Sequence, residues 1–238
     1  MNGGARTNGE HMNVNSDFSI RAVVHAADLD WVPSPMKGVE RRMLDRVGDE
    51  VARATSLVRY APGSHFSAHV HTGGEEFLVL DGVFQDEHGD FPAGSYIRNP
   101  PQSSHTPGSD AGCTILVKLW QFDLGDRTHV RIDTNKMPML EVAGRTGVHV
   151  MPLFKDERES VRLERWDPGV EIALDSEGGL EIYVLEGGFS EAGERFQAQS
   201  WLRLPAGAPL AAKAGPDGCR CWIKEGHLRF VDLGVPAG

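Results

Sequence analysis

The sequence predicts an all-β protein built from two tandem copies of one small barrel. Gly, Pro, Asn and Asp residues interrupt short apolar stretches about every 8–12 residues, a spacing typical of β-sandwiches and barrels. No segment shows the 3.6-residue periodicity of a long amphipathic helix. The second half also repeats landmarks of the first, because Pro168-Gly169 follows Pro62-Gly63 and Lys224 follows Lys118, each at an offset of 106. One internal duplication explains these matches more simply than chance does.

The apolar stretches and the turns between them place the strands and the domain boundaries. In the first copy we predict strands at 39–44, 54–60, 76–80, 83–86, 95–98 and 113–122. The predicted organisation is a polar tail at 1–16, a metal-binding barrel domain at 17–135 and a second, degenerate barrel domain at 136–238. The His-Met pair at 11–12 resembles a cloning junction, so we interpret residues 1–12 as a remnant of cloning.

Composition excludes several classes of protein. The 238 residues are 40% hydrophobic and 24% charged, an ordinary globular balance. The net charge of −10 repels a phosphate backbone, so no nucleic-acid partner is expected. No apolar run approaches the ~18 residues of a membrane helix, and no secretory signal is visible. The three cysteines form no Cys-x-x-Cys pair, which indicates reduced thiols and predicts a cytoplasmic protein.

One cluster of histidines and a glutamate predicts a metal site. His69 and His71 are two residues apart on an expected strand, so both imidazoles point to the same face. Glu75 begins the next strand after a Gly-Gly turn, and His105 follows a later strand. Three imidazoles and one carboxylate could therefore converge on one divalent transition metal. An exposed polar strand face is the alternative, but the full spacing favours a metal.

These residues resemble the two cupin motifs. The pattern G-x5-H-x-H-x3-E-x6-G is matched by Gly63, His69, His71, Glu75 and Gly82. The second motif is matched by Gly94, Pro100 and His105, whereas Gln102 and Ser109 replace its second Gly and its Asn. A wider block from Trp31 to Trp120 resembles the ChrR-type cupins. The resemblance implies a bicupin of two jelly-roll barrels, in which His69, His71, Glu75 and His105 are the metal ligands.

The second copy has lost this ligand set. At the offset of 106, the positions of His69, His71 and Glu75 are taken by Asp175, Glu177 and Glu181. Pro205 repeats Pro100 at an offset of 105, which places Leu210 at the position of His105. Three unpaired buried carboxylates would be very costly, so at least two of them should be exposed to solvent. In the first copy, Glu76 should face outward because its neighbour Glu75 faces the histidines. Arg98 is expected at the surface.

The ligand set leaves two kinds of function open. Octahedral Fe²⁺, or alternatively Mn²⁺ or Ni²⁺, would keep two positions free for a substrate and dioxygen, whereas tetrahedral Zn²⁺ would be filled by the four protein ligands. Fe²⁺ and Zn²⁺ are favoured. The first case predicts a dioxygenase acting on an enolisable, oxygenated small molecule, and the second a ChrR-like zinc sensor without catalysis. Because the chain lacks a helical domain before Asp17, no sigma-factor partner is expected, and a homodimer is compatible with the sequence.

Overall fold

The computed structural model describes residues 12–49 and 51–231. Apart from Met12, the segment interpreted as a remnant of cloning lies outside these residues. The described chain forms 21 strands and three short 3₁₀ helices, which confirms the all-β prediction. No helix in these ranges has the length and hydropathy needed to cross a lipid bilayer.

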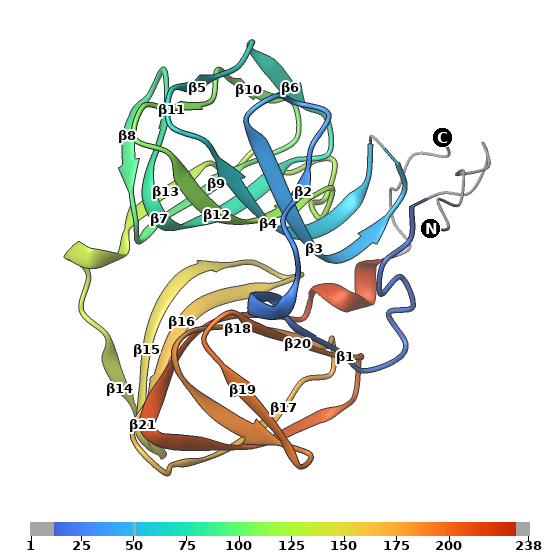
Figure 1. Cartoon of the computed structure of the whole chain (residues 1–238). Coiled ribbons are helices and arrows are strands. Elements are labelled where there is room, and N and C mark those ends of the chain that lie inside the picture. Colours follow the sequence, from blue (N-terminus) through green and yellow to red (C-terminus); the bar gives the residue numbers. More distant parts are fainter. Residues whose placement is uncertain (1–11, 50, 232–238) are drawn as a thin grey trace, which may run out of the picture.

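The first of two barrels is a curled ten-stranded sheet, drawn at the top of Figure 1, with the strand order β13-β9-β7-β12-β4-β3-β2 and with β5, β8 and β11 attached at its side. A two-stranded sheet of β6 and β10 lies at one end. The bounds are β2 (Val32–Pro33), β3 (Val39–Val47), β4 (Arg53–Tyr60), β5 (Ser64–His65), β6 (His69–His71), β7 (Glu75–Asp86), β8 (Gly89–Pro92), β9 (Ser95–Asn99), β10 (Ser103–His105), β11 (Gly108–Ser109), β12 (Cys113–Leu119) and β13 (Val130–Asp133).

The second barrel is a nine-stranded sheet with the order β1-β20-β18-β21-β16-β15-β14, to which β17 and β19 add (Figure 1). Its strands are β1 (Ala22–His25), β14 (Leu140–Val142), β15 (Arg145–Lys155), β16 (Ser160–Trp166), β17 (Glu171–Asp175), β18 (Leu180–Glu191), β19 (Glu194–Gln197), β20 (Ser200–Leu204) and β21 (Pro209–Glu225). The 3₁₀ helices are η1 (Ala26–Asp28), η2 (Thr134–Lys136) and η3 (His227–Phe230).

The two predicted strands at 76–80 and 83–86 are one strand, β7. The register of β7 against β12 shifts between Asp81, which faces Thr114, and Val79, which faces Ile115, so Leu80 is an extra residue and the chain bends there without leaving the sheet. Gly82 has a φ of +71°, and a Cβ at this position would lie 2.0 Å from the carbonyl oxygen of Gly112. The glycine therefore lets β7 continue close to the Gly112 backbone, where the sequence pattern predicts a break between two strands.

The barrels exchange their edge strands. β1 lies before the first barrel in sequence, yet it pairs with β20 of the second barrel. β13 lies between the barrels in sequence and pairs with β9 of the first. Each edge strand is followed by a 3₁₀ helix, η1 or η2, so β1 and β13 hold equivalent places in the two repeats. The exchange ties each barrel to the segment that precedes the other one.

Hydrogen bonding across the strands corrects the predicted alignment of the two copies. Glu76 stands opposite Lys118 in the first barrel, and Glu181 stands opposite Lys224 in the second. Glu181 is therefore the counterpart of Glu76, whereas the prediction aligned it with Glu75. The second copy is one residue shorter before this strand, and a slip of one residue moves every side chain to the other face.

Three apolar clusters hold the molecule together. The interior of the first barrel contains Phe77, Val79, Phe84, Ile97, Cys113, Ile115 and Val117. The interior of the second contains, among others, Trp166, Ile182, Phe189, Phe196, Leu202 and Ile223. A third cluster joins the outer faces of both sheets and includes Leu57, Leu78, Tyr96, Leu163, Tyr183, Trp201 and Trp222. Burial of this third cluster makes the contact between the barrels a hydrophobic core of its own.

Buried ion pairs cross the same interface in both directions. Lys224 of the second barrel donates from Nζ to Glu76 Oε2 of the first at 2.5 Å, and Lys118 of the first donates to Glu181 Oε2 of the second at 2.6 Å. All four side chains are at most 1% exposed. Glu76 thus points out of its own barrel as predicted, but the other barrel buries it, so it is not exposed to solvent.

Further charged groups extend this network. Glu159 Oε2 lies 2.9 Å from Lys224 Nζ, and Arg98 donates to Glu159 Oε1 at 3.3 Å. Arg98 was expected at the surface, but it is 2% exposed and lies between the rings of Phe122 and Phe154. Its planar guanidinium is suited to such stacking.

Burial disfavours the charged forms of these groups, whereas oppositely charged neighbours favour them. Burial alone would lower the pKa of Lys224, but the charges of Glu159 and Glu76 outweigh it and raise that pKa. His227 behaves differently, since burial lowers its pKa to about 3 despite a 2.8 Å hydrogen bond to Glu181. Lys224 is therefore a cation in the folded protein, and His227 is a neutral donor.

Candidate metal centre

Three short segments bring the predicted ligands together at one end of the first barrel. His69 and His71 lie on β6, which pairs with β10 so that His69 stands opposite His105. Glu75 is the first residue of β7, after the turn formed by Gly73 and Gly74. A Cβ on Gly73 would lie 2.0 Å from the Trp120 ring, so only glycine lets β7 begin at this point.

The nitrogen and oxygen atoms of these side chains point to one place. His71 Nε2 lies 2.9 Å from His105 Nε2 and 3.3 Å from Glu75 Oε2, and His105 Nε2 lies 3.6 Å from the same oxygen. One nitrogen of His69 lies within 4.8 Å of nitrogens of both other imidazoles. His71, Glu75 and His105 are buried, whereas His69 is exposed at the mouth of the barrel.

These separations fit a shared metal ion. Two ligands that each lie about 2.0–2.2 Å from one ion are roughly 2.8–3.6 Å apart at octahedral or tetrahedral angles. The separations among His71, His105 and Glu75 fall in this range. The ligand nitrogens of His69, His71 and His105 all lie within 4.8 Å of one another, so three imidazoles could hold a metal here.

Neighbouring side chains orient two of these residues. His105 Nδ1 lies 3.4 Å from Asp86 Oδ2, which leaves Nε2 free to face the site. Asn99 donates from Nδ2 to Glu75 Oε2 at 3.2 Å. Neither Asp86 nor Asn99 was among the predicted site residues, although each stands at the end of a strand next to the motifs. Histidine ligands in metal sites commonly have such a carboxylate behind them.

The electrostatics differ between the two buried imidazoles. Burial lowers the pKa of His71, and the charge of Glu75 only partly offsets this. Burial would also lower the pKa of His105, but the hydrogen bond to Asp86 and the charge of Glu75 outweigh it and raise that pKa. A neutral imidazole can donate its lone pair to a metal, so His71 is ready to bind and His105 is made more basic.

The barrel interior behind the site is apolar and aromatic. The Phe84 ring centroid lies 5.7 Å from that of His105, and the Tyr60 centroid lies 5.9 Å from that of Phe84. Burial raises the pKa of Tyr60, and the charge of Glu75 adds to this effect, so the phenol is neutral. An ion at this place would have solvent on the His69 side and a low-dielectric wall on the other.

The second barrel lacks an equivalent set of donors. Backbone bonds identify the counterpart of His71, because Gly74 N bonds His71 O at 3.3 Å and Gly179 N bonds Ser176 O at 3.3 Å. With the corrected register, the counterparts of His69, His71, Glu75 and His105 are Leu174, Ser176, Leu180 and Leu210. The predicted assignment to Asp175, Glu177 and Glu181 was wrong by one residue. Asp175 and Glu177 are exposed, as unpaired carboxylates should be.

Solved structures share this two-barrel fold. A candidate glyoxylate-induced protein of Pseudomonas aeruginosa aligns with a TM-score of 0.70 at 17% identity, over 98% of this chain and 97% of that one. A candidate dioxygenase from Nostoc punctiforme gives 0.68 at 14%, over 98% and 88%. The bacterial pirin YhhW from Escherichia coli, solved with nickel(II), gives 0.60 at 15%, over 87% and 98%.

Sequence comparison identifies the family. A search of curated proteins found no match to this sequence. The family described as the ChrR cupin-like domain matches the chain twice, over residues 19–123 and 127–229. Each match covers one of the two barrels almost completely, and the first includes the three clustered histidines. The chain therefore belongs to the ChrR cupin-like family and carries two cupin domains.

Proposed function

We propose that this protein is a metal-dependent dioxygenase acting on a small, enolisable, oxygenated substrate. The observation that carries the proposal is the convergence of three imidazoles and the Glu75 carboxylate, with separations of 2.9, 3.3 and 3.6 Å among His71, His105 and Glu75. His69, His71, Glu75 and His105 would hold one divalent ion, with Fe²⁺ favoured. When bound, the metal supplies Lewis acidity toward the substrate and a place for dioxygen.

The protein's own groups would prepare this site for chemistry. Asp86 and Asn99 hold His105 and Glu75 in the orientation that faces the ion. Phe84 and Tyr60 form an apolar wall that excludes water from the reacting centre, which strengthens electrostatic interactions there. The exposed side of His69 leaves a way in for a substrate. The similarity in fold to a candidate dioxygenase and to a nickel(II)-bound pirin is consistent with this role.

Oxygen uptake by Fe²⁺-loaded protein tests the proposal. The substrates are acetylacetone and 2-hydroxyacetophenone, since both form enolates that can chelate a metal. A dioxygenase places both atoms of O₂ in the products, so one O₂ should be consumed for each substrate cleaved. His105→Gln should abolish uptake and lower metal content, whereas His65→Gln, an exposed histidine 2.9 Å from Asp110, should change neither. Uptake that survives His105→Gln would refute the assignment.

A zinc-binding sensor without catalysis is the second candidate, and membership of the ChrR cupin-like family favours it. In that case all four side chains would fill a tetrahedral ion. X-ray absorption on zinc-loaded protein distinguishes the two. Four protein ligands and no water support the sensor, and five or six ligands support the enzyme.

A further inference from the structure

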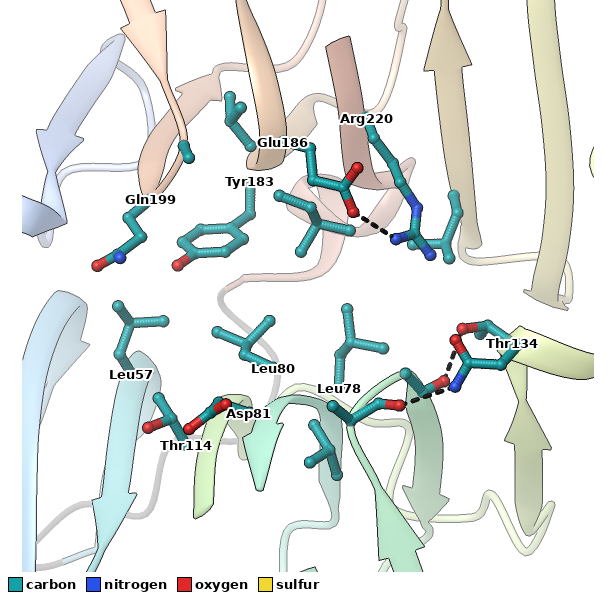
Figure 2. Close-up of a pocket in the computed structure, with 18 of the residues that line it drawn as sticks. Leu57, Leu78, Leu80, Asp81, Thr114, Thr134, Tyr183, Glu186, Gln199 and Arg220 are labelled. Carbon is teal, nitrogen blue, oxygen red and sulfur yellow. Dashed lines mark hydrogen bonds and ion pairs between the residues drawn. The ribbon is translucent and has the colours of Figure 1, made fainter. Parts of the chain in front are cut away.

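A cavity of about 600 Å³ lies between the two barrels, away from the three histidines. Figure 2 shows side chains from both barrels facing each other across it. Leu57, Leu78 and Leu80 form its first-barrel wall, and Tyr183 and Leu185 belong to the opposite wall. The volume is typical of sites for small organic ligands, which are mostly apolar with a few polar groups.

One polar group in this cavity lacks a partner. Tyr183 is 1% exposed, and its hydroxyl forms no hydrogen bond. Figure 2 shows the ring of Tyr183 pointing from the second barrel toward the facing wall, beside Gln199. Burial raises the pKa of Tyr183, so the hydroxyl is a neutral donor. A buried hydroxyl without an acceptor is costly, and a small rotation of the Tyr183 side chain would let a ligand atom in the cavity satisfy it.

The guanidinium of Arg42 lies at the end of the cavity that contains Tyr183 and Gln199. Arg42 lines the cavity and stacks on Trp31 at 4.5 Å, and it donates to Gln199 Oε1 at 3.3 Å. Its Nε is buried without a partner, and no carboxylate among the described residues pairs with it. The other arginine in the lining, Arg220, is already paired with Glu186 at 2.8 Å. The uncompensated positive charge is therefore that of Arg42.

Gln199 is the counterpart of Gly94 in the first repeat. Gly94 N bonds Val79 O at 2.8 Å and Gln199 N bonds Val184 O at 2.9 Å, so the two residues hold equivalent places. Both have a left-handed backbone, with φ of +91° and +67°. At this place the second copy carries a glutamine, in a conformation that favours glycine, and its side chain reaches Arg42.

We propose that the cavity between the barrels binds a small monocarboxylic acid with an aromatic or branched apolar body. The carboxylate would accept hydrogen bonds from Arg42 and the Tyr183 hydroxyl, and the apolar body would lie between the leucines of the two walls. The remaining acid of the lining, Asp81, is exposed and lies on the first-barrel side next to Thr114 in Figure 2. Because the ligand would touch both barrels, its binding should also stabilise their association.

Binding of phenylacetate and 4-methylpentanoate, measured by calorimetry against their primary amides, tests this site. Both acids should bind, and each amide should bind at least 10-fold more weakly because it lacks the charge that Arg42 recognises. The titration is repeated on His105→Gln protein without added metal. Equal affinity there places the ligand outside the metal centre, whether or not that centre is a dioxygenase. Loss of binding in that variant would overturn the proposal.

Three variants locate the carboxylate. Arg42→Met should weaken binding of the acids about 10-fold or more, as expected for a charge-assisted hydrogen bond. Tyr183→Phe should weaken it roughly 2- to 12-fold without lowering the melting temperature, because it removes a hydroxyl that has no partner. Arg59→Met is the matched control, since Arg59 also stacks on Trp31, at 4.4 Å, but pairs with Glu40 outside the cavity.

The result expected for Arg59→Met is unchanged binding. Absence of acid binding at millimolar concentration in the unmodified protein would overturn the proposal. So would equal affinity for acids and amides, or an equal loss in the Arg42 and Arg59 variants.

Discussion

Removing the ammonium group of Lys224 should strongly destabilise the protein. Lys224 Nζ lies 2.5 Å from Glu76 and 2.9 Å from Glu159, and it is fully buried. In Lys224→Met the two carboxyl groups lose this partner, and breaking a buried ion pair from one side costs about 3–5 kcal/mol. For a chain of this size that corresponds to a fall of roughly 6–20 °C in melting temperature.

Urea unfolding followed by tryptophan fluorescence measures this cost, since Trp201 and Trp222 are buried in the cluster between the barrels. The double variant Lys224→Met/Glu76→Gln should recover at least about 1 kcal/mol, because it also removes the unpaired charge. Lys136→Met is the control, since Lys136 is 82% exposed and its pair with Asp133 is screened by solvent, so the free energy of unfolding should change little. If Lys224→Met costs no more than Lys136→Met, the barrels are not joined by this ion pair as argued.

Three further predictions concern the metal centre and the pH response. Asp86→Asn should weaken metal binding about 10- to 100-fold in a competition titration, because His105 loses its negatively charged partner; unchanged affinity would show that Asp86 is not needed. Gly73→Ala should lower the melting temperature and the metal content together, since its Cβ would collide with Trp120; a variant with normal metal content would contradict this. The pKa of His227 is about 3 when folded against 6.5 when unfolded, so the unfolded chain binds the extra proton between these values. Stability should therefore fall by up to about 1.4 kcal/mol per pH unit as the pH drops below 6.5, and His227→Gln should reduce that slope in urea unfolding at pH 7, 6 and 5. An identical slope in both proteins would be inconsistent with a buried neutral imidazole.

The local sequence pattern was sufficient to predict those features of the site that depend on residues close together in the sequence. The alternation of side chains along a strand predicts that His69 and His71 share a face, and that Glu75 and Glu76 point in opposite directions. The structure has both arrangements. Turn residues such as Gly73 mark the start of β7 because no other residue fits there.

Alternation could not show what covers the outer face of a strand. Glu76 and Lys118 look like solvent-facing residues in period-2 patterns, but the second barrel buries them. A signal was present, since lysine recurs at 118 and 224 within otherwise apolar strands. A lysine kept in such a strand in both copies suggests a buried partner, and that partner lies in the other repeat.

Long-range pairing and small length differences also lay beyond local pattern. Nothing in the stretch Ala22–His25 indicates that it pairs with β20, nearly the whole chain away. A single missing residue between Gly169 and Gly179 shifted the predicted counterparts of the ligands from Leu174 and Ser176 to Asp175 and Glu177. The offset of 106 was taken from landmarks on either side of this stretch, and the offset of 105 between Pro100 and Pro205 was the sequence signal of the slip.

The most direct test of the metal centre is a crystal structure of metal-loaded protein, with diffraction recorded on both sides of the metal's absorption edge. We predict one anomalous peak per chain, about 2.0–2.3 Å from nitrogens of His69, His71 and His105 and from an oxygen of Glu75. A loaded protein with no peak among these four side chains would contradict the central claim.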